Sequence, residues 1–121
     1  MKELLFVFIG GGAGSAARYG LSLLFAKKGE IFTFPWHTFL SNTLGCLIIG
    51  VAMGMLAKQP GHWLLFLIVT GFCGGFTTFS TFSLELMHFF RQGNFILGGI
   101  YLFSSLLICI ICTTAGFVLA K

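Results

Sequence analysis

A stretch rich in glycine and hydroxyl residues interrupts the third of four hydrophobic runs, where residues 71–82 read GFCGGFTTFSTF. Glycine weakens a helix, and serine or threonine can turn its hydroxyl onto the backbone. The stretch carries seven such residues: Gly71, Gly74, Gly75, Thr77, Thr78, Ser80 and Thr81. Non-helical backbone at bilayer depth is tolerated only where it is buried in protein or lines an aqueous cavity. The pattern therefore predicts a broken membrane helix whose carbonyls and hydroxyls are free for an ion.

The hydrophobic runs account for almost the whole chain. They cover residues 4–26, 36–56, 63–90 and 95–120 of the 121-residue sequence. Each run is long enough to cross a hydrocarbon core, which takes about 20 residues. Only 8% of the residues are charged, against about a quarter in a soluble domain. We therefore expect one all-α integral membrane domain over residues 1–121, with four transmembrane helices in the lipid bilayer and the third broken near its middle.

The basic residues are divided evenly between the two predicted membrane faces. One face holds Lys2, Lys58 and Lys121, and the other holds Lys27, Lys28 and Arg91. Because an excess of lysine and arginine on one face sets orientation, three against three gives no preferred orientation. This balance predicts dual topology and an antiparallel homodimer with its two-fold axis in the membrane plane. A weak preference, hidden by the free terminal amine, is the alternative. No basic run suggests binding to nucleic acid.

Several polar residues lie inside the apolar runs. Arg18 either reaches the interface with its long side chain or faces a bundle interior, where intramembrane arginines usually mark a pathway; we favour the second interpretation. Asn42 either bonds a neighbouring helix or offers its amide hydrogens to a passing anion. Tyr101, Ser105 and Cys109 recur at i, i+4 spacing, so they share one flank of a helix and predict a polar track.

Two further features have ordinary structural interpretations. Glu85, near His88 and Arg91, is interpreted as a solvated or salt-bridged residue at a helix end. Cys109 and Cys112 form a lone C-x-x-C motif inside an apolar helix, which we interpret as buried packing rather than redox or metal chemistry. No nucleophile with a neighbouring base and no cluster of metal-ligating side chains is visible, so we expect no enzymatic activity.

Three motifs in this order resemble the Fluc (CrcB) family of prokaryotic fluoride channels. They are GGGAGSAARYGLS in the first run, TFLSNTLGCLIIG in the second and GFCGGFTTFSTFSLE in the third. The resemblance covers essentially the whole chain. It implies a dual-topology antiparallel homodimer in the inner membrane, with two fluoride pores and a structural sodium ion at the dimer interface. It also implies passive fluoride export that lowers cytoplasmic fluoride.

The resemblance also implies roles for individual residues. The backbone carbonyls of Gly74 and Thr77 would bind the sodium ion together with the same pair from the second chain. Cys109 stands where the family's polar track leads us to expect a hydroxyl, and a thiol is a weaker donor. The residues expected at the fluoride pore are Arg18, Asn42, Thr78, Phe79, Ser80, Phe82, Tyr101 and Ser105.

The chemistry of these side chains agrees with this expectation. Fluoride is small and strongly hydrated, so a selective path must replace its water with donors such as the Asn42 amide and the Thr78 and Ser80 hydroxyls. Aromatic rings have a positive edge, so Phe79 and Phe82 can face an anion favourably. A small proton-coupled multidrug exporter is the alternative function, but it needs a membrane-embedded carboxylate, and the first run holds Arg18 and no acid. A non-transporting subunit would leave the predicted break without a purpose.

Overall fold

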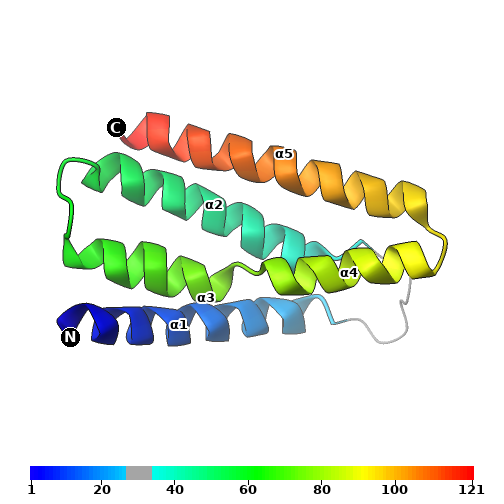
Figure 1. The fold of residues 1–121 in the computed structure, drawn as a ribbon, viewed down its shortest axis with the longest axis horizontal. Helices are drawn as coiled ribbons and strands as arrows, with labels where there is room; N and C mark the ends of the chain where they lie inside the picture. Colours follow the sequence, from blue (N-terminus) through cyan, green and yellow to red (C-terminus); the bar gives the residue numbers. More distant parts are fainter. Residues whose placement is uncertain (27–33) are drawn as a thin grey trace.

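Four long helical columns lie side by side and form the molecule (Figure 1). The computed structural model describes residues 1–26 and 34–121. The third column is built from three pieces, whereas each of the others is one helix. The elements are α1 (Lys2–Leu24), α2 (Trp36–Leu56), η1 (Leu65–Cys73), α3 (Gly74–Phe76), α4 (Phe79–Arg91) and α5 (Phe95–Ala120). All four columns are long and apolar enough to cross a membrane, which confirms the predicted all-α architecture with four spans.

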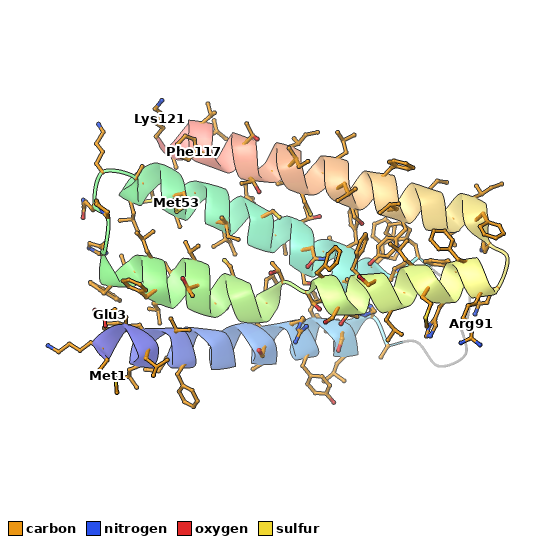
Figure 2. All side chains as sticks on the ribbon, in the orientation of Figure 1. Met1, Glu3, Met53, Arg91, Phe117 and Lys121 are labelled. Carbon is orange, nitrogen blue, oxygen red and sulfur yellow. The ribbon has the colours of Figure 1, made fainter. Side chains whose placement is uncertain are left out.

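The columns are arranged in the order α5, α2, the third column and α1 (Figure 1). Met1, Glu3 and Lys121 lie at one end of the bundle, and Arg91 lies at the other (Figure 2). This arrangement agrees with the predicted placement of those charges on opposite faces. Lys27 and Lys28, which complete the charge count, lie outside the described residues.

Glycines bring the columns into close contact. A Cβ atom added to Gly10 or Gly14 of α1 would collide with the carbonyl oxygens of Leu67 and Phe72 in η1. An added Cβ on Gly50 of α2 would likewise collide with the Thr113 carbonyl of α5. These helices therefore approach at backbone distance, as small residues allow in membranes. Gly10 and Gly14, like Gly50 and Gly54, are small residues four positions apart, so each pair presents two such contacts on one helix face.

The break in the third column is shorter than the glycine-rich pattern suggested. The chain stays helical through Phe76 and resumes a helix at Phe79. Only Thr77 (φ −85°, ψ 155°) and Thr78 (φ −152°, ψ 120°) are extended. The helix persists through Gly71 and Gly75 because α1 packs tightly against them: a Cβ on Gly75 would collide with the Gly11 carbonyl. The prediction of a break is confirmed, and its extent is corrected to two residues.

The segment before the break is itself unusual. η1 is a π-helix of 9 residues, a form that is rare and occurs frequently at functional sites. Beyond the break, Phe82, Phe89 and Tyr101 form a buried aromatic cluster between α4 and α5. The break is thus bounded by backbone packing against α1 on one side and by aromatic packing against α5 on the other.

Candidate functional site

The amide side chain of Asn42 forms two hydrogen bonds with the backbone of the break at Thr78. Its Nδ2 donates to the Thr78 carbonyl at 3.1 Å, and its Oδ1 accepts from the Thr78 amide at 2.7 Å. Together the two bonds pair the extended residue as a neighbouring strand would. The structure therefore shows Asn42 bonding a neighbouring helix, one of the two roles considered for it. A primary amide has two N–H groups, so one remains for another acceptor.

Thr78 begins the second half of the column. Its Oγ1 accepts from the backbone amide of Thr81 at 3.2 Å and so caps the N-terminus of α4. In an unbroken helix, the amides of Thr78 and Thr81 would donate to the carbonyls of Gly74 and Thr77. Here they donate elsewhere, so both carbonyls lose their helical donors. The break thus leaves carbonyl oxygens at the end of α3 and amide hydrogens at the start of α4.

Most of the residues predicted for an anion pore lie around one groove beside the break. The groove has a volume of about 260 Å³. Phe79 is 76% exposed and Phe82 is 5% exposed, and their ring centroids lie 5.8 Å apart. The lining comes from α2, the third column and α5: Asn42, Cys46, Ile49, Thr77, Thr78, Phe79, Phe82, Ser105, Leu106, Cys109 and Ile110.

One hydroxyl in this groove lacks a partner. Ser105 is only 5% exposed, and its Oγ finds no hydrogen-bond partner among the described residues. Serine at this depth commonly bonds a carbonyl of its own helix, as Thr113 does to Cys109 at 3.0 Å. A buried polar atom without a partner costs about 1–3 kcal/mol. The groove therefore contains a donor that a bound acceptor would satisfy.

Arg18 lies in a second hollow, of about 300 Å³. This hollow is lined by Ser15, Arg18, Tyr19, Ser22, His37, Thr38, Thr78 and Thr81. Within residues 1–26 and 34–121, no carboxylate pairs with the Arg18 guanidinium. Thr78 lines both hollows, so a cationic side chain and the groove meet at the break. This placement favours the interpretation of Arg18 as a cavity residue.

Tyr101 does not line the groove. Its ring is fully buried against Phe82, with centroids 5.0 Å apart, and its hydroxyl donates to Glu85 Oε2 at 2.6 Å. Glu85 Oε1 accepts from Thr38 Oγ1 at 2.8 Å and lies 3.3 Å from His37 Nε2. Tyr101 therefore belongs to a hydrogen-bonded cluster around the Glu85 carboxylate, whereas Ser105 lines the groove.

The position and the partners of Glu85 both differ from those that the sequence predicts. It lies in the middle of α4 rather than at a helix end, and its side chain is only 17% exposed. Its partners come from α2 and α5, not from His88 and Arg91 as the spacing along the chain suggested. Only the tertiary fold brings them together, although a lone acid in an apolar run was a usable signal.

Ser80 is also outside the groove in this chain. It is exposed, and its Oγ lies 3.3 Å from Thr78 Oγ1. For metals, the described residues contain no group of three or more His, Cys, Asp or Glu side chains that could hold an ion. The released carbonyls of Gly74 and Thr77 are oxygen ligands of the kind that suits a hard cation.

Comparisons with known proteins identify relatives of this chain. The family model described as "CrcB-like protein, Camphor Resistance (CrcB)" matches residues 5–117. A protein of Flavobacterium psychrophilum named "Fluoride-specific ion channel FluC" is 38% identical, over 100% of this chain and 98% of the relative. Proteins of the same name from Phocaeicola vulgatus and Methylobacillus flagellatus are 43% and 37% identical. The alignments cover 77% of both chains in the first case, and 100% of this chain and 96% of the relative in the second.

Proposed function

We propose, from the premise that the chain belongs to the CrcB-like family, that this multi-pass membrane protein is a fluoride-selective ion channel. The channel would lie in the inner membrane of a prokaryotic cell and let fluoride leave passively, which lowers cytoplasmic fluoride. The observation that carries the proposal is the unpartnered Ser105 hydroxyl, buried in a groove beside the break.

Donors around the groove suit a small, strongly hydrated anion. Among residues 1–26 and 34–121, Ser105 Oγ–H has no acceptor, and the second N–H of the Asn42 amide is not used in the bond to Thr78. Both can replace water around fluoride. Phe79 and Phe82 line the same groove, and the edge of a phenyl ring carries positive charge that attracts an anion. A larger, more weakly hydrated halide gains less from these donors, which supports selectivity.

The two half-helices add fixed partial charges. The N-terminus of α4 carries about half a positive elementary charge and begins at the groove, where it favours an anion. The C-terminus of α3 carries the opposite sign, and the Gly74 and Thr77 carbonyls lie there. Broken membrane helices use their two ends in this way for ions of opposite charge. Arg18, beyond Thr78, adds a full positive charge near the break.

A sodium ion fits the carbonyl end of the break. Gly74 is exposed, and a Cβ added there would meet nothing within 4 Å, so a second chain can approach this backbone. Carbonyls of Gly74 and Thr77 from each of two chains would supply the ligands. When bound, the ion contributes positive potential in a medium of low dielectric constant, where a charge acts strongly.

The proposed channel is an antiparallel homodimer with two pores. The even division of lysine and arginine between the two faces supports dual insertion. α1 also exposes small residues, Gly12, Ala13 and Ala16, beside the broken column, and small residues allow close approach between membrane helices. Phe79 is largely exposed in the single chain and would be covered in the dimer.

A proton-coupled multidrug exporter has one observation in its favour, the half-buried Glu85. Its carboxylate, however, accepts from Thr38 and Tyr101 and faces His37, so its oxygens are already paired. An exporter would expel a lipophilic cation from vesicles when given a pH gradient alone. The channel should not.

Fluoride efflux from liposomes tests the proposal. Purified protein is reconstituted into vesicles loaded with fluoride, chloride and a lipophilic cation, and each is followed after a potassium ionophore removes the opposing potential. We expect rapid fluoride release with chloride and the cation retained. Equal release of chloride, or release of the cation alone in response to a pH gradient, would refute the proposal.

A further inference from the structure

Two free thiols line the groove. Cys46 of α2 and Cys109 of α5 both contribute to its lining, and neither forms a disulfide. The Cys109 thiol lies beside both Cys46 and Thr43. One turn beyond Cys46, Gly50 packs against the Thr113 carbonyl of α5 without room for a Cβ. The two helices are therefore in backbone contact one turn from Cys46, which brings the positions of the two cysteines close together.

We propose that Cys46 and Cys109 form a binding site for a soft divalent metal ion that coordinates two ligands linearly, of the Hg(II) class. Thiolate sulfur selects soft metals, whereas magnesium and calcium prefer oxygen. A structural zinc site needs four ligands, and no group of three His, Cys, Asp or Glu side chains exists in the part of the chain that the structure describes. Two sulfur ligands suit metals that coordinate linearly.

Binding of HgCl₂ requires no oxidant or reductant. Two S–H bonds and two Hg–Cl bonds break, two Hg–S bonds form, and two protons and two chloride ions leave to solvent. Hg(II) with two thiolates is neutral, which avoids the cost of a buried net charge. Thr43 Oγ1 is buried and has no partner among the described residues, and it lies beside Cys109. Its hydroxyl can donate to the metal-bound sulfur.

The pair that the structure favours differs from the C-x-x-C motif of the sequence. Cys112 follows Cys109 on the same helix, but it does not line the groove. Cys73 is fully buried and does not line it either. These two cysteines therefore provide matched controls, because each removes one thiol from the same region without removing a proposed ligand.

Occupation of the site has a functional consequence, which rests on the proposed channel function. Ser105 and Phe82 line the same groove of about 260 Å³. A metal bridging α2 and α5 there would obstruct an anion that passes Ser105. We therefore expect fluoride flow to be blocked by soft metals that do not act on the lipid.

Direct binding provides the first test. Purified dimeric protein is titrated with HgCl₂, and Hg–S charge-transfer absorbance and native mass spectrometry give the stoichiometry and affinity per chain. We expect a tight site that is lost in Cys46→Ala and in Cys109→Ser and kept in Cys73→Ala and Cys112→Ala. Loss of the site in either control variant, or its persistence in Cys46→Ala and Cys109→Ser, would overturn the proposal.

Fluoride efflux provides the second test, with each variant compared with its own metal-free rate. At a free concentration of ten times the Kd, mass action leaves about one site in eleven empty, so wild-type efflux should fall about tenfold and recover with dithiothreitol. Equal inhibition of Cys109→Ser would overturn the block. If HgCl₂ binds the pair but no protein releases fluoride, the channel function fails and the metal site stands. If efflux proceeds and HgCl₂ does not bind the pair, the metal site fails alone.

Discussion

Replacing Asn42 with alanine removes the two hydrogen bonds, of 2.7 and 3.1 Å, that its side-chain amide forms with the Thr78 backbone. A buried backbone amide and a buried carbonyl without partners cost about 1–3 kcal/mol each, although interhelical hydrogen bonds in membrane proteins average only about 0.6 kcal/mol. We expect a destabilisation between these limits, about 1–4 kcal/mol. Because 1.4 kcal/mol corresponds to a factor of ten, a loss of about 1 kcal/mol from the conformation of the break should lower fluoride efflux about fivefold, and a larger loss should lower it further.

The assay combines thermal unfolding of the purified protein with fluoride efflux from liposomes. Asn42→Asp tests the donor, because it keeps an acceptor for the Thr78 amide, loses the donor to the Thr78 carbonyl and adds a negative charge. Since a buried, unpaired carboxylate is costly and repels an anion, this variant should lose at least as much stability and efflux as Asn42→Ala. Ser41→Ala is the matched control, since the one hydrogen bond of the Ser41 hydroxyl within the described part of the chain goes to the Thr38 carbonyl of its own helix. Wild-type stability and efflux in Asn42→Ala would refute the reasoning.

Three other perturbations test separate parts of the structure. Gly14→Ala, whose Cβ collides with the Phe72 carbonyl, should lower the free energy of unfolding by about 1–3 kcal/mol. Gly12→Ala, with open space around it, should change that free energy little. Equal losses of stability in the two variants would contradict the backbone contact between α1 and η1. Phe79→Ile combined with Phe82→Ile should abolish fluoride efflux. Phe103, which is 71% exposed on α5, provides the control, and Phe103→Ile should leave efflux unchanged. Unchanged efflux in the double variant would remove Phe79 and Phe82 from the pore. Replacing sodium with a larger organic cation should weaken both the dimer, seen by cross-linking, and fluoride efflux, and full retention of both would rule out the sodium site at Gly74 and Thr77.

The spans could be predicted closely from the sequence because hydrophobic length is a direct signal in a bilayer. The second and fourth runs, 36–56 and 95–120, coincide with α2 and α5. The break was predicted in the right place but over too many residues. Glycine lacks a Cβ, which weakens a helix and also permits close packing, and the sequence alone does not separate the two effects. At Gly71 and Gly75 the packing against α1 prevails.

The candidate site was predicted in part for a related reason. Asn42, Phe82 and Ser105 are predicted at the pore, and all three line the groove. The sequence indicates them because a polar amide, a hydroxyl or a ring beside a helix break is suited to contact an ion. Two other groupings depend on which faces of different helices meet: the hydrogen-bonded cluster around the Glu85 carboxylate, and the thiol pair of Cys46 and Cys109. Spacing along one helix carries no information on such contacts, so Tyr101 was assigned to the track rather than to Glu85.

The most direct test of the central claim is the distance from bound fluoride to the side chain of Asn42. Solid-state NMR can measure the dipolar coupling between ¹⁹F and ¹⁵N in liposomes containing asparagine-labelled protein. The chain has two asparagines, and Asn94, which caps α5 through Leu97, is the internal control. We expect fluoride within hydrogen-bond distance of Asn42 Nδ2, about 2.7–3.2 Å, and no coupling to Asn94. Fluoride efflux by the same liposomes without coupling at Asn42 would contradict the account.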